Sequence, residues 1–594
     1  MRIPKSRALR PTSSITTILT PRHAHPRLPL TASISIALRM ASTTASGDGH
    51  ADRFAAGVSI ADLPKTWHFT CSLPADSQYP TPADSHETPR NQIRPRQVRN
   101  AIFSYVRPEP AENPELLAVS PAAMRDIGIK EGDETTDEFR QTVAGNRLHG
   151  WDQDKLEGGY PWAQCYGGYQ FGQWAGQLGD GRAISLFETK NPATGVQYEL
   201  QLKGAGLTPY SRFADGKAVL RSSIREFIVS EALHALRIPT TRALSLTLLP
   251  NSKVRRETVE PGAIVLRFAQ SWLRFGNFDI LRARSERPLL RTLATYVATD
   301  VLGGWEALPA RLANPDDPKA SPADPGRGVP ATAIQGPDDA AENRFTRLYR
   351  EITRRNALTV AKWQAYGFMN GVLNTDNTYR NQPTIIWWNL VRLGEALGEL
   401  LGAGPAVDDA TFAEHGVAEA DADALVARAE KIISQVGDEY KAVFLAEYKR
   451  LMTARLGLRT FVDADFDDLF SGLLDTMDAL ALDFHHVFRR LSATPDWARE
   501  PGDGDAARRR AMKAVNPNFV PRNWVLDEVI RRVEKGGERD VLRRAMHMAL
   551  HPFEDAWHGE TVDGRVYEGD AEEEARWVGD VPKLERAMQC SCSS

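Results

Sequence analysis

The chain of 594 residues is long enough for two or more domains, or for one large catalytic core with insertions. Its 42% apolar and 25% charged residues are typical of a soluble globular protein. The net charge is −4, and residues 1–47 contribute seven positive charges and no acid, which leaves −11 for the remainder and argues against nucleic acid as a partner. Four cysteines exclude a disulfide framework, and no uncharged apolar run is long enough to span a membrane.

Arginine, serine and threonine are frequent in residues 1–47, and the continuous apolar segment of a secretory signal is missing. This composition predicts a mitochondrial transit peptide and therefore a mitochondrial protein. A disordered basic tail is the alternative interpretation.

Residues 62–290 are expected to form a β-rich lobe. After an irregular, proline-rich extension over 62–125, the runs AISLFETK and YELQLKGAG alternate as strands do, and NPATG between them predicts a turn. SSIREFIVSEALHALRI has helical periodicity, with Ser222 or Ser223 as the N-cap. GAIVLRFAQSWLRF predicts a return to a strand.

The second half of the chain is expected to be mostly helical. Residues 306–343 hold seven prolines, which predicts a surface loop or disordered insertion. A helical lobe is expected over 344–580, and a flexible tail with Cys590 and Cys592 over 581–594. A β-rich section followed by a helical one predicts an α+β enzyme with two lobes and a cleft between them.

Two glycines, Gly179 and Gly181, precede a predicted strand, and Arg182 follows them. Glycines let backbone N–H groups approach phosphate oxygens, and a neighbouring arginine can bind phosphate through two hydrogen bonds. A hairpin turn is the alternative interpretation of this segment.

Lys203 ends a predicted strand that follows this turn, and Glu226 and Glu231 lie on the next predicted helix. A strand lysine paired with a helix glutamate is how protein kinases hold ATP phosphates. The alternative is an edge-strand lysine that keeps the sheet soluble.

Further candidate residues come after this pair. Asp215 and Gly216 form a second turn among several cations. Arg267 and Arg274 bracket FAQSWL, and seven residues apart in an extended segment they need not share a face.

The segment NTDN contains Asn374, Asp376 and Asn377. In phosphoryl or nucleotidyl transfer an aspartate can accept the proton of the attacking hydroxyl, while an asparagine binds Mg²⁺ against the phosphates. The alternative is an Asx-rich turn after the helix predicted for RLYREITRRNALTVAKWQAYGFMNGVL.

Several stretches together resemble the selenoprotein O family of kinase-like protein adenylyltransferases. They span most of residues 62–530 in family order, and the long central stretch is very specific. The stretches are NAIFSYVRPEP, LLAVSPAAM, YGGYQFGQWAGQLGDGRA, QLKGAGLTPYSRFADGKAVLRSSIREFIVSEALHALRIPTTRAL, LRFAQSWLRFGNF, WQAYGFMNGVLNTDN, QPTIIWWNLVRL and VNPNFVPRNWV.

The resemblance implies a protein-kinase-like fold that binds ATP in a reversed orientation, so that AMP is transferred to Ser, Thr or Tyr hydroxyls of protein substrates. It implies Asp376 as the proton acceptor and Asn377 as a ligand of Mg²⁺ or Mn²⁺. It implies nucleotide contacts by Gly179, Gly181, Arg182, Lys203, Asp215, Gly216, Arg267 and Arg274, with Glu226 pairing Lys203 and Glu231 as the second choice.

One part of the family pattern is missing. Members continue after NTDN to an aspartate in a DYGP or DFGP motif, the second metal carboxylate, whereas this chain passes from Thr378 to Tyr379 and meets its next acid at Glu395. The loss puts the metal site and the activity in doubt. A natural isoform and an error in the gene model are both open. Two smaller departures are Tyr169 and Asn370, where many relatives have histidine.

Three functions follow from these observations. The first is an ATP-dependent protein adenylyltransferase, with Cys590 and Cys592 as redox-sensitive thiols that regulate it. The second is a nucleotide-binding pseudoenzyme or scaffold that has lost catalysis. Ordinary phosphorylation is the third.

Overall fold

The structure is a computed structural model that describes residues 57–170, 172–308, 340–370, 381–462, 464–495, 503–562 and 565–582. All of these residues belong to one unit, Arg53–Ser594. Several predictions concern residues outside the described ones, namely the transit peptide, most of the 306–343 insertion, Asp376, Asn377, Cys590 and Cys592.

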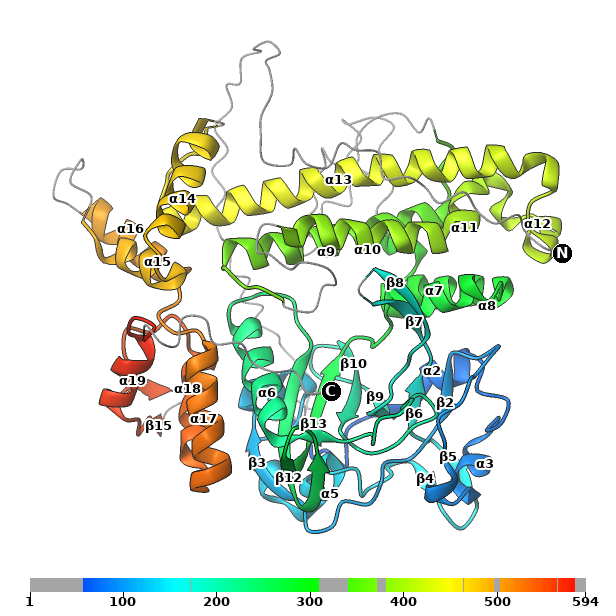
Figure 1. Cartoon of the computed structure of the whole chain (residues 1–594), viewed down its shortest axis with the longest axis horizontal. Coiled ribbons are helices and arrows are strands. Elements are labelled where there is room, and N and C mark those ends of the chain that lie inside the picture. Colours follow the sequence, from blue (N-terminus) through cyan, green and yellow to red (C-terminus); the bar gives the residue numbers. More distant parts are fainter. Residues whose placement is uncertain are drawn as a thin grey trace, which may run out of the picture. The chain divides into compact units, whose positions relative to one another are not determined.

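An antiparallel sheet forms the centre of the N-terminal half (Figure 1). Its main path runs β2 (Phe103–Tyr105), β6 (Trp162–Gln164), β9 (Ala183–Lys190), β10 (Gln197–Lys203), β13 (Val259–Ala269), β12 (Arg242–Arg255) and β3 (Glu115–Val119). The short strands β1 (Lys65–Thr66) and β11 (Ala218–Val219) join β9 and β13. Separate two-stranded sheets pair β4 (Trp151–Asp152) with β5 (Glu157–Gly158), β7 (Gly167–Gln170) with β8 (Gln173–Gln177), and β14 (Thr561–Val562) with β15 (Arg565–Val566).

The strands β9 and β10 follow the alternating pattern of the sequence. They pair antiparallel, and the turn between them is closed by Asn191, whose side-chain oxygen accepts hydrogen bonds from the amides of Ala193 and Thr194 at 2.8 and 3.1 Å. Such an Asx turn is what an Asn-Pro segment favours.

Helix α6 (Leu220–Ala235) follows β11 directly, and Val219 is its N-cap. The prediction that Ser222 or Ser223 caps this helix is therefore wrong. Both serines lie inside the first turns, where the Ser222 hydroxyl donates to the carbonyl of Val219 at 3.1 Å. Val219 is extended and pairs with Gly262 of β13, so the helix starts directly at the end of the strand and has no side-chain cap.

Helices dominate the rest of the described chain, as the sequence predicts. Those before the 306–343 insertion are α2 (His68–Ser72), α3 (Pro82–Glu87), α4 (Pro121–Ile127), α5 (Asp137–Val143), α7 (Phe275–Ala283) and α8 (Arg287–Tyr296). Those after it are α9 (Arg344–Ala365), α10 (Gln382–Ala396), α11 (Gly398–Gly402), α12 (Ala410–His415), α13 (Ala422–Leu456), α14 (Gly472–Ala479), α15 (Phe484–Ala493), α16 (Asp503–Lys513), α17 (Asn523–Gly536), α18 (Asp540–Leu550) and α19 (Ala571–Val578).

Helix α9 ends earlier than its sequence pattern suggests. Ala365 is its last residue, and Gly367 has a φ of +61°, a conformation in which glycine commonly terminates a helix. The long helix α13 lies beside α9, and the two share an apolar core that includes Ala361, Tyr440 and Met452 (Figure 1). None of the helices among the described residues has the length and apolar character of a membrane span.

The last helices pack against α6 rather than against α9 and α13. Helices α17 and α18 lie beside α6 (Figure 1). Ile224 and Phe227 of α6 share one buried cluster with Val525 of α17, Leu542 of α18 and Trp577 of α19. The sequence did not predict this return to the β-rich half. The outer side of the helix that bears Glu226 is thus covered by the C-terminal part of the chain.

Candidate nucleotide-binding site

The turn that contains Gly179 and Gly181 connects β8 to β9. Because β8 pairs with β7 and not with β9, this turn is not a hairpin, which was the alternative interpretation of the glycines. Gly179 has a φ of +142°, and a Cβ there would lie 2.5 Å from the Cβ of Tyr210. Asp180, only 2% exposed, accepts a hydrogen bond from the backbone amide of Gln164 at 3.1 Å. The turn is therefore fixed by Tyr210 and by the sheet.

Lys203 ends β10, and its ammonium group forms an ion pair with the carboxylate of Glu226 on α6. The other acid considered from the sequence, Glu231, is fully buried and pairs with Arg242 at 2.8 Å. The helix thus presents one acid to the strand lysine and the other to a different strand.

Arg267 joins this pair from β13. One of its guanidinium nitrogens lies 3.1 Å from Glu226, and the same guanidinium donates to the side-chain oxygen of Gln201 at 2.7 and 3.2 Å. The Gln201 amide donates in turn to Asp180 at 3.4 Å. A chain of polar contacts therefore links α6, β13 and β10 to the glycine turn.

Arg274 completes the network at the start of α7. Its guanidinium lies 2.9 Å from Asp180 and stacks over the ring of Tyr166, with 4.4 Å to the ring centre. The sequence left open whether Arg267 and Arg274 face the same way. In the structure both contribute to one cluster, because the chain leaves the strand after Ala269 and turns into α7.

Arg182 is half-buried beside this network, and among the described residues its guanidinium has no hydrogen-bond or ion-pair partner. Burial lowers its pKa, and the attraction of Glu226 opposes that effect. A desolvated, unpaired cation is costly unless an anion neutralises it. Four cations, Arg182, Lys203, Arg267 and Arg274, share two carboxylates, Asp180 and Glu226, so the cluster is suited to an anionic ligand.

The pKa shifts of Lys203 and Glu226 also arise from burial and from the neighbouring charges of the cluster. The pKa of Lys203 is lowered by burial and by the nearby charges of Arg267 and Arg182, although Glu226 opposes them. Burial raises the pKa of Glu226, but the attraction of Lys203 and Arg267 outweighs it and leaves the pKa below its ordinary value. Added negative charge would relieve the repulsion among the three cations.

Asp215 and Gly216 lie on a neighbouring turn. Asp215 pairs with Arg256 at 2.8 Å and is near enough to Arg182 to act on its charge. Gly216 has a φ of +73°, and a Cβ there would lie 2.3 Å from the carbonyl carbon of Gly206, in the loop that follows Lys203. The second glycine turn therefore contacts the loop at the end of β10.

Sequence reasoning missed Asp180 and Gln201 as members of the network and Glu199 as their neighbour, although β10 carries a signal for Gln201 and Glu199. Glu199, Gln201 and Lys203 alternate along a strand otherwise rich in apolar residues, so they share one face. Glu199 is buried, and burial raises its pKa to about 8, so at neutral pH it is mostly protonated and adds little negative charge to the cluster. Asp180 lies between two glycines, and in a segment interpreted as a turn its pairing with Arg274 was not predicted.

The proposed proton acceptor and metal ligand, Asp376 and Asn377, lie outside the described residues. Within the parts of the chain that the structure describes, no group of three or more His, Cys, Asp or Glu side chains could hold a metal ion. The next acid, Glu395 on α10, pairs with Arg392 and lies 3.7 Å from Arg282.

The arrangement defines a class of protein. A strand lysine held by a helix glutamate, with arginines around them, in an α+β fold is the arrangement found in kinase-like proteins. A family model described as "Protein adenylyltransferase SelO" matches residues 91–379 and 378–503. The chain belongs to this family.

Curated relatives agree with the family model. The chain is 36% identical to a protein of Schizosaccharomyces pombe named "Protein adenylyltransferase SelO, mitochondrial", over 90% of this chain and 99% of the relative. It is 30% identical to the Saccharomyces cerevisiae protein of the same name, over 84% and 92% of the two chains. A "Protein nucleotidyltransferase YdiU" of Nitrosospira multiformis is 32% identical, over 80% and 91%.

The family model matches in two segments that meet at Thr378 and Tyr379. This is the point at which the sequence lacks the expected second acidic motif. A match that breaks there is what a missing internal segment would produce.

Proposed function

We propose that this chain binds ATP at the cluster of Arg182, Lys203, Arg267 and Arg274 and transfers AMP to Ser, Thr or Tyr hydroxyls of other proteins. The observation that carries the proposal is that these four cations cluster around only two carboxylates, Glu226 and Asp180, with Arg182 unpaired among the described residues. Membership in the adenylyltransferase family supports AMP as the transferred group.

The cations bind and orient the triphosphate. Glu226 holds Lys203 in place, Asp180 holds Arg274, and the glycine turn brings backbone close to the phosphates. In the transfer step the substrate hydroxyl attacks the α-phosphorus, its proton passes to Asp376, and the bond from the α-phosphorus to the bridging oxygen breaks to release pyrophosphate. A metal ion would neutralise charge on the phosphates, but the described residues offer no set of ligands for it, so no step is assigned to one.

A second candidate, a nucleotide-binding protein without transferase activity, is favoured by one observation. The acid nearest in sequence after Asp376 is Glu395, and its carboxylate is engaged by Arg392 and near Arg282, so it is a poor replacement for the missing metal ligand. In this second candidate function the protein still binds ATP but does not transfer AMP to a protein substrate.

Incubation with ATP labelled at the α-phosphate or at the γ-phosphate separates the candidates, in the presence of Mg²⁺ or Mn²⁺. The proposal predicts that protein takes up the α-label only and that Asp376→Ala abolishes the uptake. Uptake of γ-label would indicate phosphorylation. Thermal stabilisation by ATP with neither label on protein would indicate the second candidate.

We propose a mitochondrial location and redox control for the same protein. The basic, acid-free composition of residues 1–47 supports the location, as do the names of the two yeast relatives. Cys590 and Cys592, separated by one residue, are the proposed redox-sensitive thiols.

Nucleotide affinity is expected to fall as the pH rises, because the lowered pKa of Lys203 makes it lose its proton earlier than an ordinary lysine does. Above that pKa, ATP binding requires uptake of one proton, so each further pH unit should weaken it about tenfold. Lys203→Arg keeps its charge and should flatten the profile. Calorimetric titrations between neutral and alkaline pH measure both slopes, and equal slopes would exclude Lys203 as the titrating group.

A further inference from the structure

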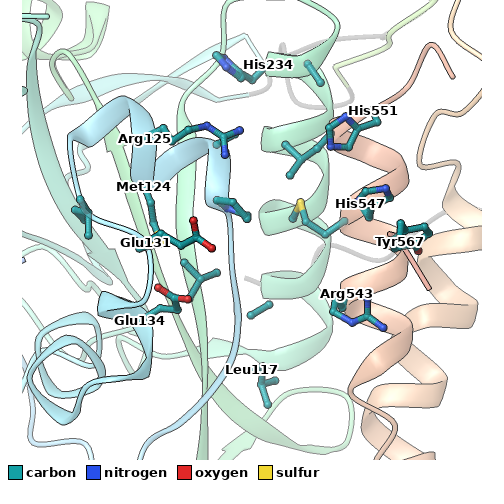
Figure 2. A pocket seen from close by; sticks show the side chains of 18 of the residues that line it. Leu117, Met124, Arg125, Glu131, Glu134, His234, Arg543, His547, His551 and Tyr567 are labelled. Carbon is teal, nitrogen blue, oxygen red and sulfur yellow. The ribbon is translucent and has the colours of Figure 1, made fainter. Parts of the chain in front are cut away.

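A large groove lies at the C-terminal end of α6, and none of the cation cluster lines it. Its volume is about 1330 Å³, and its walls come from β3, α4, the C-terminal end of α6, and α18 (Figure 2). Small-molecule pockets usually measure about 300–1,000 Å³, so the space suits a longer ligand.

The floor of the groove is an edge of the sheet. β3 is the last strand of the main path and pairs with β12 on one side, and among the described residues no strand pairs with its other side. Leu116, Leu117, Ala118 and Val119, consecutive residues of β3, all line the groove. A run of consecutive lining residues indicates that the strand faces the groove with its edge, where the backbone groups of a further strand can bond.

The two walls lie on opposite faces of the sheet. Leu117 and Ala118 pack with the cluster of α6 and α18, whereas Leu116 and Val119 pack with the cluster that includes Met124 of α4. The pairing of β3 with β12 shifts register between Leu116 and Ala118, which accounts for two adjacent residues on one face. A strand added to β3 would therefore direct alternate side chains toward α18 and toward the α4 side.

The walls differ in charge (Figure 2). Glu131 and Glu134 lie on the α4 side together with one cation, Arg125, so acids outnumber bases there. Arg543 and His547 on α18 and His551 at its C-cap follow at spacings of four residues, which puts them on one helix face. An extended ligand that carries acids on one face and bases on the other would match both walls.

Two polar atoms at the groove are buried without a partner among the described residues. They are a carboxylate oxygen of Glu134 and the hydroxyl of Tyr567. A buried polar group without a hydrogen bond is destabilising. Both atoms therefore favour a ligand that brings polar groups as well as apolar ones.

We propose that this groove binds an extended peptide segment of another protein, which adds to the edge of β3 with acidic side chains toward Arg543 and basic side chains toward Glu131 and Glu134. The proposal concerns binding alone and does not depend on the transfer reaction proposed above. The expected ligand is a peptide whose acidic and basic side chains alternate along the chain and whose backbone can pair with the edge of β3 that no described strand occupies.

A fluorescein-labelled peptide of sequence EKLVEKLV is the probe, because its acids and bases fall on opposite faces of a strand. EKLVKELV has the same composition but mixes the charges on each face. A peptide with the acidic and basic faces interchanged would not serve as a control. A bound strand that shifts its register by one residue turns each side chain to the other face, and so restores the original match. Fluorescence anisotropy with the full chain should show binding of EKLVEKLV at least about tenfold tighter than binding of EKLVKELV.

Charge reversal on the protein gives the matched test. Arg543 is 56% exposed, so Arg543→Glu should fold normally, and it replaces the arginine of the α18 wall with an acid. It should weaken EKLVEKLV about tenfold and should bind KKLVKKLV more tightly than the wild type does. Arg531→Glu, an exposed site on α17 that does not line the groove, should change neither affinity. Hydrogen exchange of residues 115–119 should slow when EKLVEKLV binds.

Five results would overturn the proposal. The first two are equal affinity for both labelled peptides, or equal effects of Arg543→Glu and Arg531→Glu. Binding only to a chain that ends at residue 582 would assign the groove to the chain's own C-terminal residues. Self-association that competes with the peptide would assign it to a second copy, and binding without slower exchange in β3 would exclude strand addition.

Discussion

Replacing Lys203 with methionine should weaken ATP binding about 10- to 100-fold, as measured by calorimetric titration. A hydrogen bond or ion pair to a charged group contributes about 1.5–3 kcal/mol, and Lys203 is the only ammonium among the four cations of the cluster. Methionine keeps much of the side-chain volume and removes the charge.

The folded state should survive this substitution, since Arg267 remains 3.1 Å from Glu226 and the helix acid keeps a partner. Lys253→Met is the matched control, because Lys253 is exposed on β12 and makes no contact with the cluster. It should leave the affinity unchanged. If both variants bound ATP as the wild type does, the nucleotide would have to bind elsewhere.

Replacing Glu439 with glutamine should lower the free energy of unfolding by about 3–5 kcal/mol, the cost of breaking a buried ion pair. Glu439 on α13 accepts hydrogen bonds from Arg350 at 2.9 and 3.1 Å and from Arg354 at 2.8 Å, and both arginines lie on α9 with no exposed surface. Glu342, which lies 2.5 Å from Arg350, cannot serve both guanidinium groups.

Urea unfolding followed by circular dichroism measures this loss, with Glu430→Gln as the control at an exposed site of the same helix. The control should change stability by less than about 0.5 kcal/mol. A wild-type midpoint for Glu439→Gln would contradict the view that this ion pair joins α9 to α13.

The local pattern of the sequence predicted the strand that ends at Lys203 and the helix that follows. Glu226 and Glu231 are five residues apart, which is about 140° around a helix, so only one can face a given strand. Which one does depends on how the apolar side of α6 rests on the sheet. The orientation of α6 on the sheet is set by tertiary packing. The sequence alone could therefore place Glu226 before Glu231 as the partner of Lys203, but it could not decide between them.

The sequence could not predict that Arg267 and Arg274 lie in one cluster, because this too depends on tertiary contacts. Their approach depends on the turn between β13 and α7 and on two linking side chains, Gln201 and Asp180, that belong to other segments. The return of α17, α18 and α19 to α6 is also a long-range contact, and helical periodicity carries no information about the partner of an apolar face.

Other predictions stay untested by the structure. The roles of Asp376 and Asn377 concern residues outside the described ones, and the boundaries at 62–290 and 344–580 remain predictions. The break of the family match at Thr378 supports the inference that an internal segment is missing there.

A crystal structure of the full chain with a non-hydrolysable ATP analogue tests the central claim most directly. The claim is that the triphosphate binds to the cation cluster built on the Lys203–Glu226 pair. The expected map shows phosphate oxygens within hydrogen-bond distance of Lys203, Arg267 and Arg274, with the α-phosphate toward residues 374–377. A triphosphate bound away from Lys203 would contradict the account.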